Sequence, residues 1–261
     1  MRRDDNVLPS PTSNAFDTLD TVPKHPRVAE TDDDSPIFRD YSADSRVLFV
    51  VFSGLRRSPG EKPGFSFINV TSPLPAKRLF LRDLTKAWYL RGLPGLTRGV
   101  EDTAEFFRNE IRATGAERVV MTGYSLGAFA AMLYGTLIEA NEVHAFSPQT
   151  FVSLRQRIRH RDHRWNRYVL KLPLSTQSRF RDLRPLLARS RAKTQHHIHY
   201  AEDSRLDVLH AKHVEGLPNV KLHSYNEGKH RLVTDLRDKG MLIKIYEEAV
   251  GAQGFSGGSR R

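Results

Sequence analysis

Short apolar runs alternate with amphipathic stretches along most of the chain. Residues 47–52 (VLFVVF) are continuously apolar, as expected of a strand that helices cover on both faces. Within 100–114 apolar side chains recur every three or four positions, which predicts a helix that ends at Gly115. By the same criteria, strands are predicted at 65–70, 77–81, 118–122, 143–146, 196–201 and 220–225, and further helices at 207–215 and 232–250.

The order strand, helix, strand at these intervals predicts an α/β fold with a mainly parallel sheet and helices on both of its faces. Residues 46–250 suit one such domain. Residues 1–45 hold five prolines and an acidic run without a sustained apolar period, so they are predicted to be a disordered or loosely draped leader. The pattern breaks again at about 151–194, predicted to be a cap insertion, and 251–261 are predicted to be a flexible tail.

A serine between two glycines joins a predicted strand directly to an apolar helix of small residues. Residues 123–127 (GYSLG) fit the pattern G-x-S-x-G. A strand that turns straight into a helix strains the backbone at Ser125, and only small neighbours such as Gly123 and Gly127 allow that close approach. The helix N-terminus also offers free N–H groups that stabilise negative charge. We therefore predict that Ser125 is a nucleophile; the alternative is a structural turn whose serine caps the helix.

A serine hydroxyl is a weak nucleophile at neutral pH unless a base accepts its proton and an acid orients that base. His230 lies five residues beyond the strand predicted at 220–225 and is the predicted base, with capping of the terminal helix as its alternative role. Asp203 is the preferred acid because it lies near the end of the preceding strand and has no evident structural role. Asp207 is the second candidate, because it is placed to cap the next helix but a loop of this length can also carry it to His230.

In these features the chain resembles the α/β-hydrolase family over residues 46–250, since nucleophile, acid and base follow in that family's order. The resemblance implies that the backbone N–H groups of Leu126 and of Leu55 form an oxyanion hole. Many members have His-Gly where this chain has Ser-Gly at 53–54, and many carry their acid at the position of Ser204. The choice of acid is therefore left open.

A looser similarity, in 52–54, 82–83, 88–89 and 145–149, is to bacterial α/β-hydrolase-like proteins associated with surface-glycan assembly. It implies an ester-handling role on a glycan or an acyl carrier. The predicted function is a serine-dependent hydrolase of an ester or thioester that works through an acyl-enzyme and needs no cofactor. Two alternatives stay open: an acyltransferase that moves the acyl group to a sugar or another alcohol, and a non-catalytic binding protein of the same fold.

The net charge of +11 is concentrated in the predicted cap insertion. Between 155 and 191 there are eleven arginines and Lys171 against only Asp162 and Asp182. This segment is interpreted as a solvated cap, as a lid that binds an anionic small-molecule or glycan ester, or as a nucleic-acid surface. The last is least favoured because no nucleic-acid-binding motif accompanies the arginines.

Two further observations bear on localisation and metals. The chain has no cysteine, no apolar run of the roughly 18 residues needed to span a bilayer, and no signal-peptide pattern, so we expect a soluble cytoplasmic protein. His196, His197 and His199 crowd one strand and are interpreted as packing residues rather than a zinc site, because no further ligand lies at a suitable spacing. His210 and His213 are predicted to lie on the solvated face of a helix.

Overall fold

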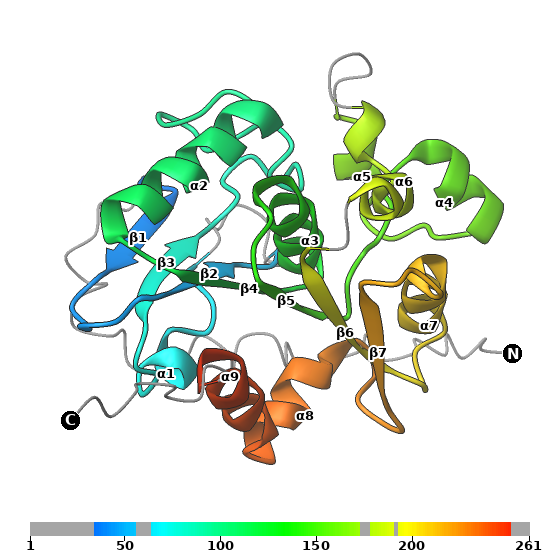
Figure 1. The fold of residues 1–261 in the computed structure, drawn as a ribbon. Coiled ribbons are helices and arrows are strands. Elements are labelled where there is room, and N and C mark those ends of the chain that lie inside the picture. Colours follow the sequence, from blue (N-terminus) through cyan, green and yellow to red (C-terminus); the bar gives the residue numbers. More distant parts are fainter. Residues whose placement is uncertain (1–33, 56–63, 173–177, 191–192, 252–261) are drawn as a thin grey trace, which may run out of the picture.

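The computed structural model describes residues 34–55, 64–172, 178–190 and 193–251. A seven-stranded sheet in the order β1-β3-β2-β4-β5-β6-β7 forms its centre, and only the edge strand β1 runs antiparallel to its neighbour (Figure 1). The predicted α/β fold with a mainly parallel sheet is confirmed. The strands are β1 (Ile37–Asp40), β2 (Val47–Phe52), β3 (Lys77–Leu81), β4 (Arg118–Tyr124), β5 (Glu142–Phe146), β6 (Gln195–Ala201) and β7 (Val220–Tyr225).

Helices cover both faces of the sheet: α2, α3 and α7 lie on one face, and α1, α8 and α9 on the other (Figure 1). Three short helices, α4 to α6, follow β5 beyond the edge of this layer. No helix in the described ranges combines the length and the apolar character needed to cross a membrane. The helices are α1 (Ile68–Thr71), α2 (Val100–Thr114), α3 (Leu126–Ile138), α4 (Leu154–His160), α5 (Asn166–Val169), α6 (Leu183–Arg189), α7 (Arg205–Val214), α8 (Leu232–Asp238) and α9 (Met241–Gly251), with 3-10 turns η2 (Ser178–Phe180) and η3 (Lys229–Arg231).

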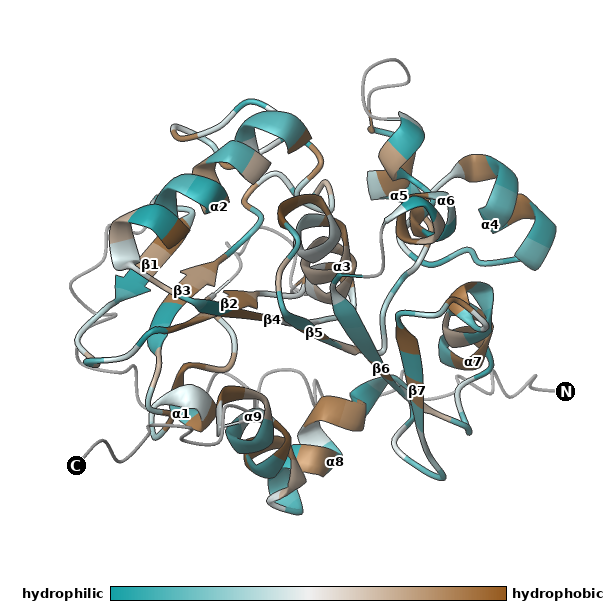
Figure 2. Ribbon diagram, in the orientation of Figure 1, coloured by the Kyte–Doolittle hydropathy of each residue, from teal (hydrophilic) through white to brown (hydrophobic). Residues whose placement is uncertain are grey.

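The centre of the sheet is apolar on both faces because helices cover both. Every residue of β2 from Leu48 to Phe52 is fully buried. The brown, hydrophobic parts of Figure 2 accordingly gather in β2, β4 and the enclosed helix α3, whereas the outer turns of α2 and α9 are teal. Within this core the ring of Phe52 contacts Tyr89 edge-on at 5.3 Å and stacks on Tyr134 at 5.9 Å, which joins the strand to α3. The elbow between β4 and α3 therefore adjoins a closely packed apolar core.

The strand predicted at 65–70 is wrong, because this segment forms a loop followed by α1. The alternating aromatic residues that suggested a strand instead pack on other elements. The Phe65 ring lies 6.1 Å from that of Phe38 in β1 and beneath the Arg82 guanidinium, and the Phe67 ring lies 6.2 Å from that of Tyr246 in α9. Alternation therefore marked two packing contacts rather than a strand face.

Two element boundaries also differ from the prediction. Residues 37–40, placed in the predicted leader, form β1 and pair with β3, so residues 34–45 belong to the described domain; the remainder of that leader and the predicted tail from 252 lie outside the described residues. The single helix predicted at 232–250 is two helices, because Gly240 adopts a left-handed conformation (φ 64°) between α8 and α9. A helical hydrophobic period does not reveal such a break when both halves pack on one sheet.

Four imidazoles from neighbouring strands stack on the sheet face that α9 covers. His144 of β5, His197 and His199 of β6, and His223 of β7 have ring centroids 4.7 to 5.4 Å apart. Hydrogen bonds link His144 to His199 (3.2 Å) and His197 to His223 (2.9 Å), while a Glu142 oxygen lies 3.1 Å from His144 and 3.2 Å from His197. Over the described ranges, no three side chains among histidines and carboxylates converge as a metal site would require. These histidines pack the strands together.

Buried histidines make the folded state sensitive to acid. Burial lowers the pKa of His196, on the opposite sheet face, to about 3, and that of His197 in the stack to about 4, from an ordinary 6.5. Below pH 6.5 these histidines therefore bind protons in the unfolded chain but stay neutral in the folded chain. The free energy of unfolding falls towards pH 4 by roughly 1.4 kcal/mol per pH unit for each fully buried imidazole.

We expect the melting temperature to fall steadily between pH 6.5 and pH 4, measured by circular dichroism. His197→Gln, which can still bond to His223 and Glu142, is expected to make this dependence shallower. His163→Gln, at an exposed position, is the matched control and leaves the slope unchanged. Equal slopes in all three proteins would show that the stack does not cause the acid sensitivity.

Candidate active site

Ser125 sits at the sharp turn between β4 and α3. Its backbone has φ 53° and ψ −111°, a conformation that a non-glycine residue adopts only under strain. The turn is held from both sides: the Ser125 N–H donates to the carbonyl of Phe146 at 2.9 Å, and its carbonyl accepts from the N–H of Phe129 at 3.2 Å. The serine is 4% exposed. The surrounding core thus fixes the position of the hydroxyl.

Both glycines of the elbow are required by close backbone approach. A Cβ on Gly123 would lie 2.3 Å from the carbonyl carbon of Gly127, and a Cβ on Gly127 would lie 2.2 Å from the carbonyl oxygen of Phe52. No side chain fits at these distances. The first contact lets α3 start directly above β4, and the second seats the N-terminus of α3 against the end of β2.

The predicted base, His230, reaches Ser125 from the short turn η3. Its Nε2 lies 3.2 Å from Ser125 Oγ. The hydroxyl of Tyr124, the residue before the nucleophile, donates to the His230 carbonyl, and the two rings lie 5.2 Å apart. His230 therefore does not simply cap a helix: its backbone is fastened to the elbow and its side chain faces the serine.

The structure brings Asp207, and not the preferred Asp203, to the imidazole. The carboxylate oxygens of Asp207 lie 3.0 and 3.2 Å from His230 Nδ1. Asp203 instead accepts the backbone N–H of Lys229 at 2.8 Å, so it supports the turn beside the histidine. The capping role expected of Asp207 is also absent, because α7 begins at Arg205 with Ser204 in the N-cap position. Asp207 is the third residue of α7, in its first turn, and is fully buried.

A second partner contacts the Asp207 carboxylate from the arginine-rich segment. Arg164, between α4 and α5, places Nη1 3.3 Å from Asp207 Oδ1. Burial opposes ionisation of this carboxyl, but its hydrogen bond with His230 and the charges of His230 and Arg164 outweigh burial, so the pKa of Asp207 lies below its ordinary value. Asp207 is therefore ionised at neutral pH and can hold His230 with its Nδ1–H turned towards the carboxylate.

Arg164 belongs to a buried polar network that sequence reasoning missed. Its Nε and Nη2 donate to the two oxygens of Asp162 at 3.1 and 3.2 Å, and Arg157 Nη1 lies 3.5 Å from the same carboxylate. His210 Nε2 lies 3.1 Å from Asp162, and its Nδ1 accepts the Thr150 N–H at 3.1 Å. Asp162 is wholly buried, and despite that burial the hydrogen bonds from His210 and Arg164 hold its pKa far below the ordinary value.

The predicted solvated position of His210 and His213 is therefore wrong. His210 is fully buried, which lowers its pKa to about 4, and His213 Nε2 lies 2.8 Å from Asp182. One signal for this was present in the sequence. Asp207, His210 and Val214 recur at helical spacing, and in the structure they form the buried stripe of α7. Applied to residues 207–214, the helical period favours Asp207 as the residue that faces the protein interior.

The two N–H groups expected to form an oxyanion hole lie on adjoining segments. Leu126 is the first residue of α3, where a backbone N–H has no acceptor within the helix. Leu55 lies in the segment that follows β2, and a Cβ on the preceding Gly54 would lie 3.1 Å from the carbonyl oxygen of Tyr124. The hydroxyl of the buried Tyr89 bonds to the Ser53 carbonyl at 3.0 Å and fixes the start of the loop. This loop therefore runs directly beside the elbow.

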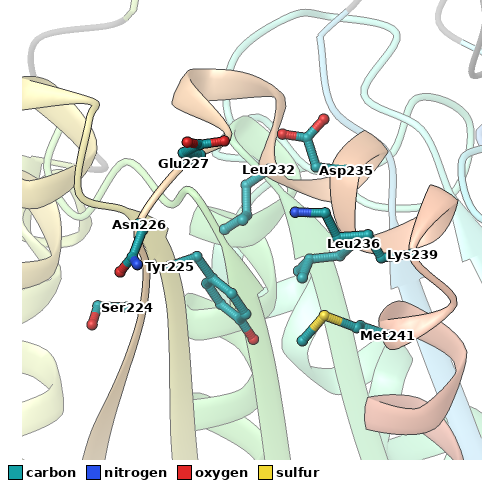
Figure 3. A pocket seen from close by; sticks show the side chains of 9 residues that line it. All are labelled: Ser224, Tyr225, Asn226, Glu227, Leu232, Asp235, Leu236, Lys239 and Met241. Atoms are coloured by element: carbon teal, nitrogen blue, oxygen red, sulfur yellow. The ribbon is translucent and has the colours of Figure 1, made fainter.

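A separate pocket of about 430 Å³ lies between the end of β7 and α8, next to the turn η3 that carries His230 (Figure 3). Tyr225 and Met241 face each other across it, and the charged ends of Asp235 and Lys239 lie at its α8 side. Neither Ser125 nor His230 lines this pocket. Glu227, from the loop just before His230, does line it, so the pocket adjoins the candidate site without including the linked serine and histidine.

Compared by sequence, no family model and no curated protein matches the chain. Compared by fold, the chain is similar to the capsule O-acetyltransferase of Neisseria meningitidis serogroup A, with a TM-score of 0.60 and 14% identity over 80% of this chain and 90% of that one. A variant of that enzyme in complex with CoA matches with a TM-score of 0.59 and 12% identity over 79% and 90% of the two chains.

Two other solved structures extend the comparison. An α/β hydrolase from the metagenome of lagoon sediments at Mar Chica, Morocco, has a TM-score of 0.52 and 14% identity over 81% of this chain and 94% of that one. A glycosylation-associated protein complex (Gap123) from Streptococcus agalactiae has a TM-score of 0.53 and 14% identity, but the match spans only 44% of that chain and 84% of this one. This chain has the α/β-hydrolase fold.

Proposed function

We propose that this protein is a serine-dependent hydrolase of an ester or thioester that works through an acyl-enzyme. The observation that carries the proposal is the chain of contacts from Ser125 Oγ to His230 Nε2 (3.2 Å) and from His230 Nδ1 to Asp207 (3.0 Å). A hydroxyl, an imidazole and a carboxylate linked in this order form the arrangement that activates a serine for attack on an acyl carbon. The strained backbone at Ser125 supports the same role, because strained residues cluster at active sites.

In the proposed reaction, His230 Nε2 takes the proton of Ser125 as Oγ forms a bond to the acyl carbon. The carbonyl π electrons move to oxygen, and the N–H groups of Leu126 and Leu55 stabilise that oxyanion. When the oxyanion collapses, the bond to the leaving alkoxide or thiolate breaks and the imidazolium returns the proton to it. Water, deprotonated by His230, then repeats the attack on the acyl-enzyme and releases a carboxylic acid. Asp207 stabilises the imidazolium in both halves.

Acyl transfer is the second candidate function, and the similarity in fold to an O-acetyltransferase supports it. The fold is shared with a capsule O-acetyltransferase, and a variant of that enzyme is found in complex with CoA. In this version a sugar or other alcohol attacks the acyl-enzyme in place of water, and a thioester is the natural donor. The residues of the candidate site serve both reactions equally, so the identity of the acceptor has to be measured.

The proposal predicts covalent labelling of one serine by a fluorophosphonate probe. The wild type should be labelled, and Ser125→Ala should lose the label completely because Oγ is the atom that attacks phosphorus. Ser224→Ala, which removes an exposed serine on β7, is the matched control and should label like the wild type. Mass spectrometry of the labelled peptide gives the position. A wild type that resists labelling, or a Ser125→Ala variant that still labels, disproves the assignment of the nucleophile.

The acceptor can be identified from the products of an activated acetyl ester or acetyl thioester. A hydrolase releases acetate at the rate at which the leaving group appears, whatever alcohol is added. A transferase diverts acetyl groups to an added sugar, which mass spectrometry detects, and acetate release falls in proportion. Ser125→Ala serves as the blank in both assays.

A further inference from the structure

The outer face of α4 combines aliphatic and cationic side chains at the periphery of the molecule. Ile158 is 76% exposed and Leu154 37% exposed, and they lie one turn apart on the same side of the helix. Arg155 and Arg159 are also exposed and lie next to them, because successive helical residues are about 100° apart. These four residues, which we call the outer face of α4, cover an arc of about 140°. Figure 2 shows α4 at the edge of the fold with brown and teal segments side by side.

The opposite side of α4 is held against the protein. Gln156 donates to Asp182 at 3.0 Å, the buried Arg157 donates to Asn166 at 2.8 Å, and the His160 ring lies 5.6 Å from that of Phe151. These three contacts fix the rotation of α4 about its axis. The contacts on the opposite side therefore hold the outer face of α4 towards solvent.

The positive charge of this face has no compensating carboxylate. Within the part of the chain that the structure describes, Arg155, Arg159 and the following Arg161 make no ion pair. The two carboxylates of this segment are turned inwards, Asp162 to Arg164 and His210, and Asp182 to His213. Arg179, by contrast, is also exposed but pairs with Glu101 of α2. The arginines beside Leu154 and Ile158 therefore remain available to an external anion.

We propose that the outer face of α4 docks this protein onto an anionic lipid surface. Acidic headgroups complement the unpaired arginines, and the exposed Leu154 and Ile158 enter the boundary between headgroups and acyl chains. A basic helix face with aliphatic residues among its cations is the pattern expected of such contacts. Single-stranded nucleic acid would instead use aromatic side chains for stacking and would gain nothing from the two aliphatic ones. This inference is independent of the proposed catalytic function.

Flotation of the full chain with vesicles tests the proposal. We expect binding to vesicles of phosphatidylcholine mixed with phosphatidylglycerol, no binding to phosphatidylcholine alone, and loss of binding as salt is raised. Arg155→Gln/Arg159→Gln should weaken binding by about 25-fold, since each cation near an anionic surface contributes about fivefold. Leu154→Ser/Ile158→Ser, which keeps every charge, should weaken it by at least about tenfold. The melting temperature of each variant confirms that it is folded.

Arg46→Gln/Arg112→Gln is the matched control, because it removes the same charge from exposed positions in the segments that lead into the opposite, amino-terminal ends of β2 and β4. It should bind vesicles within about twofold of the wild type. Equal losses in this control would mean that net charge alone acts, and the proposal would be overturned. Binding to both kinds of vesicle alike would overturn it too, as would an unchanged affinity of the Leu154→Ser/Ile158→Ser protein. Salt-dependent binding of a labelled single-stranded RNA without any vesicle binding would assign the face to nucleic acid instead.

Discussion

Asp207→Asn is expected to lower kcat for an activated ester by about 10⁴-fold, the effect of this exchange in a serine, histidine and aspartate triad. The carboxylate accepts the Nδ1–H of His230 at 3.0 Å and so leaves Nε2 free to take the proton of Ser125. An amide at position 207 can instead donate to Nδ1, which favours the imidazole tautomer that carries its proton on Nε2. That tautomer cannot act as a base towards Ser125.

Asp203→Asn provides the control for this prediction. Its side-chain oxygen can still accept the N–H of Lys229, so the turn that carries His230 is retained. A loss of less than about tenfold is expected, in line with one weakened hydrogen bond. Steady-state kinetics of both variants with the same ester make the comparison. A larger loss in Asp203→Asn than in Asp207→Asn would contradict the assignment of the acid.

Asp162→Asn is expected to destabilise the fold by about 3 to 5 kcal/mol, because it removes the buried charge that faces Arg157 and Arg164. Arg164 keeps a carboxylate partner in Asp207, but Arg157 is buried and has only neutral acceptors besides Asp162. For a domain of this size such a loss corresponds to a fall of about 6 to 20 °C in the melting temperature. Thermal unfolding followed by circular dichroism measures it.

Three further variants, Glu117→Gln, Arg157→Met and Arg157→Met/Asp162→Asn, make the measurement specific to burial. Glu117→Gln breaks an exposed ion pair with Arg46 and should cost about 1 kcal/mol or less. The Arg157→Met/Asp162→Asn double variant should lose less unfolding free energy than the two single variants lose together. Removal of both charges leaves neither of them buried without its partner. Additive losses in this double-mutant cycle would show that the two side chains do not interact as a charge pair.

Six of the seven strands of the sheet, β2 to β7, and the elbow followed from local sequence. Residues 47–52 are apolar at every position because the strand is covered on both faces, whereas a strand with one face in water would alternate apolar and polar residues. The glycines at 123 and 127 predicted a close backbone approach on each side of Ser125, and the structure has one at each glycine, too close for any side chain. Such features depend on near neighbours along the chain, so a single sequence carries them.

The contacts that complete the site are long-range and were not visible in this way. Asp203 and Asp207 are four residues apart in the sequence. Which of them faces His230 depends on where α7 begins, and the structure places its first residue at Arg205. The approach of Arg164 to Asp207 spans 43 residues, and no period or motif marks it. The run of arginines looked uniform, yet Arg157 is buried in a network while Arg155 and Arg159, two positions to either side, face outwards.

The guanidinium of Arg164 joins the arginine-rich segment to the carboxylate of Asp207, and this has a consequence for protein engineering. In many enzymes a segment above the site can be exchanged for that of a homologue to change selectivity, as a module that leaves the reacting groups untouched. Here the exchange would also remove Arg164, the cation beside Asp207, together with its partner Asp162. A chimaera of this protein should therefore keep Asp207 and the four side chains of the network linked to it, Arg157, Asp162, Arg164 and His210.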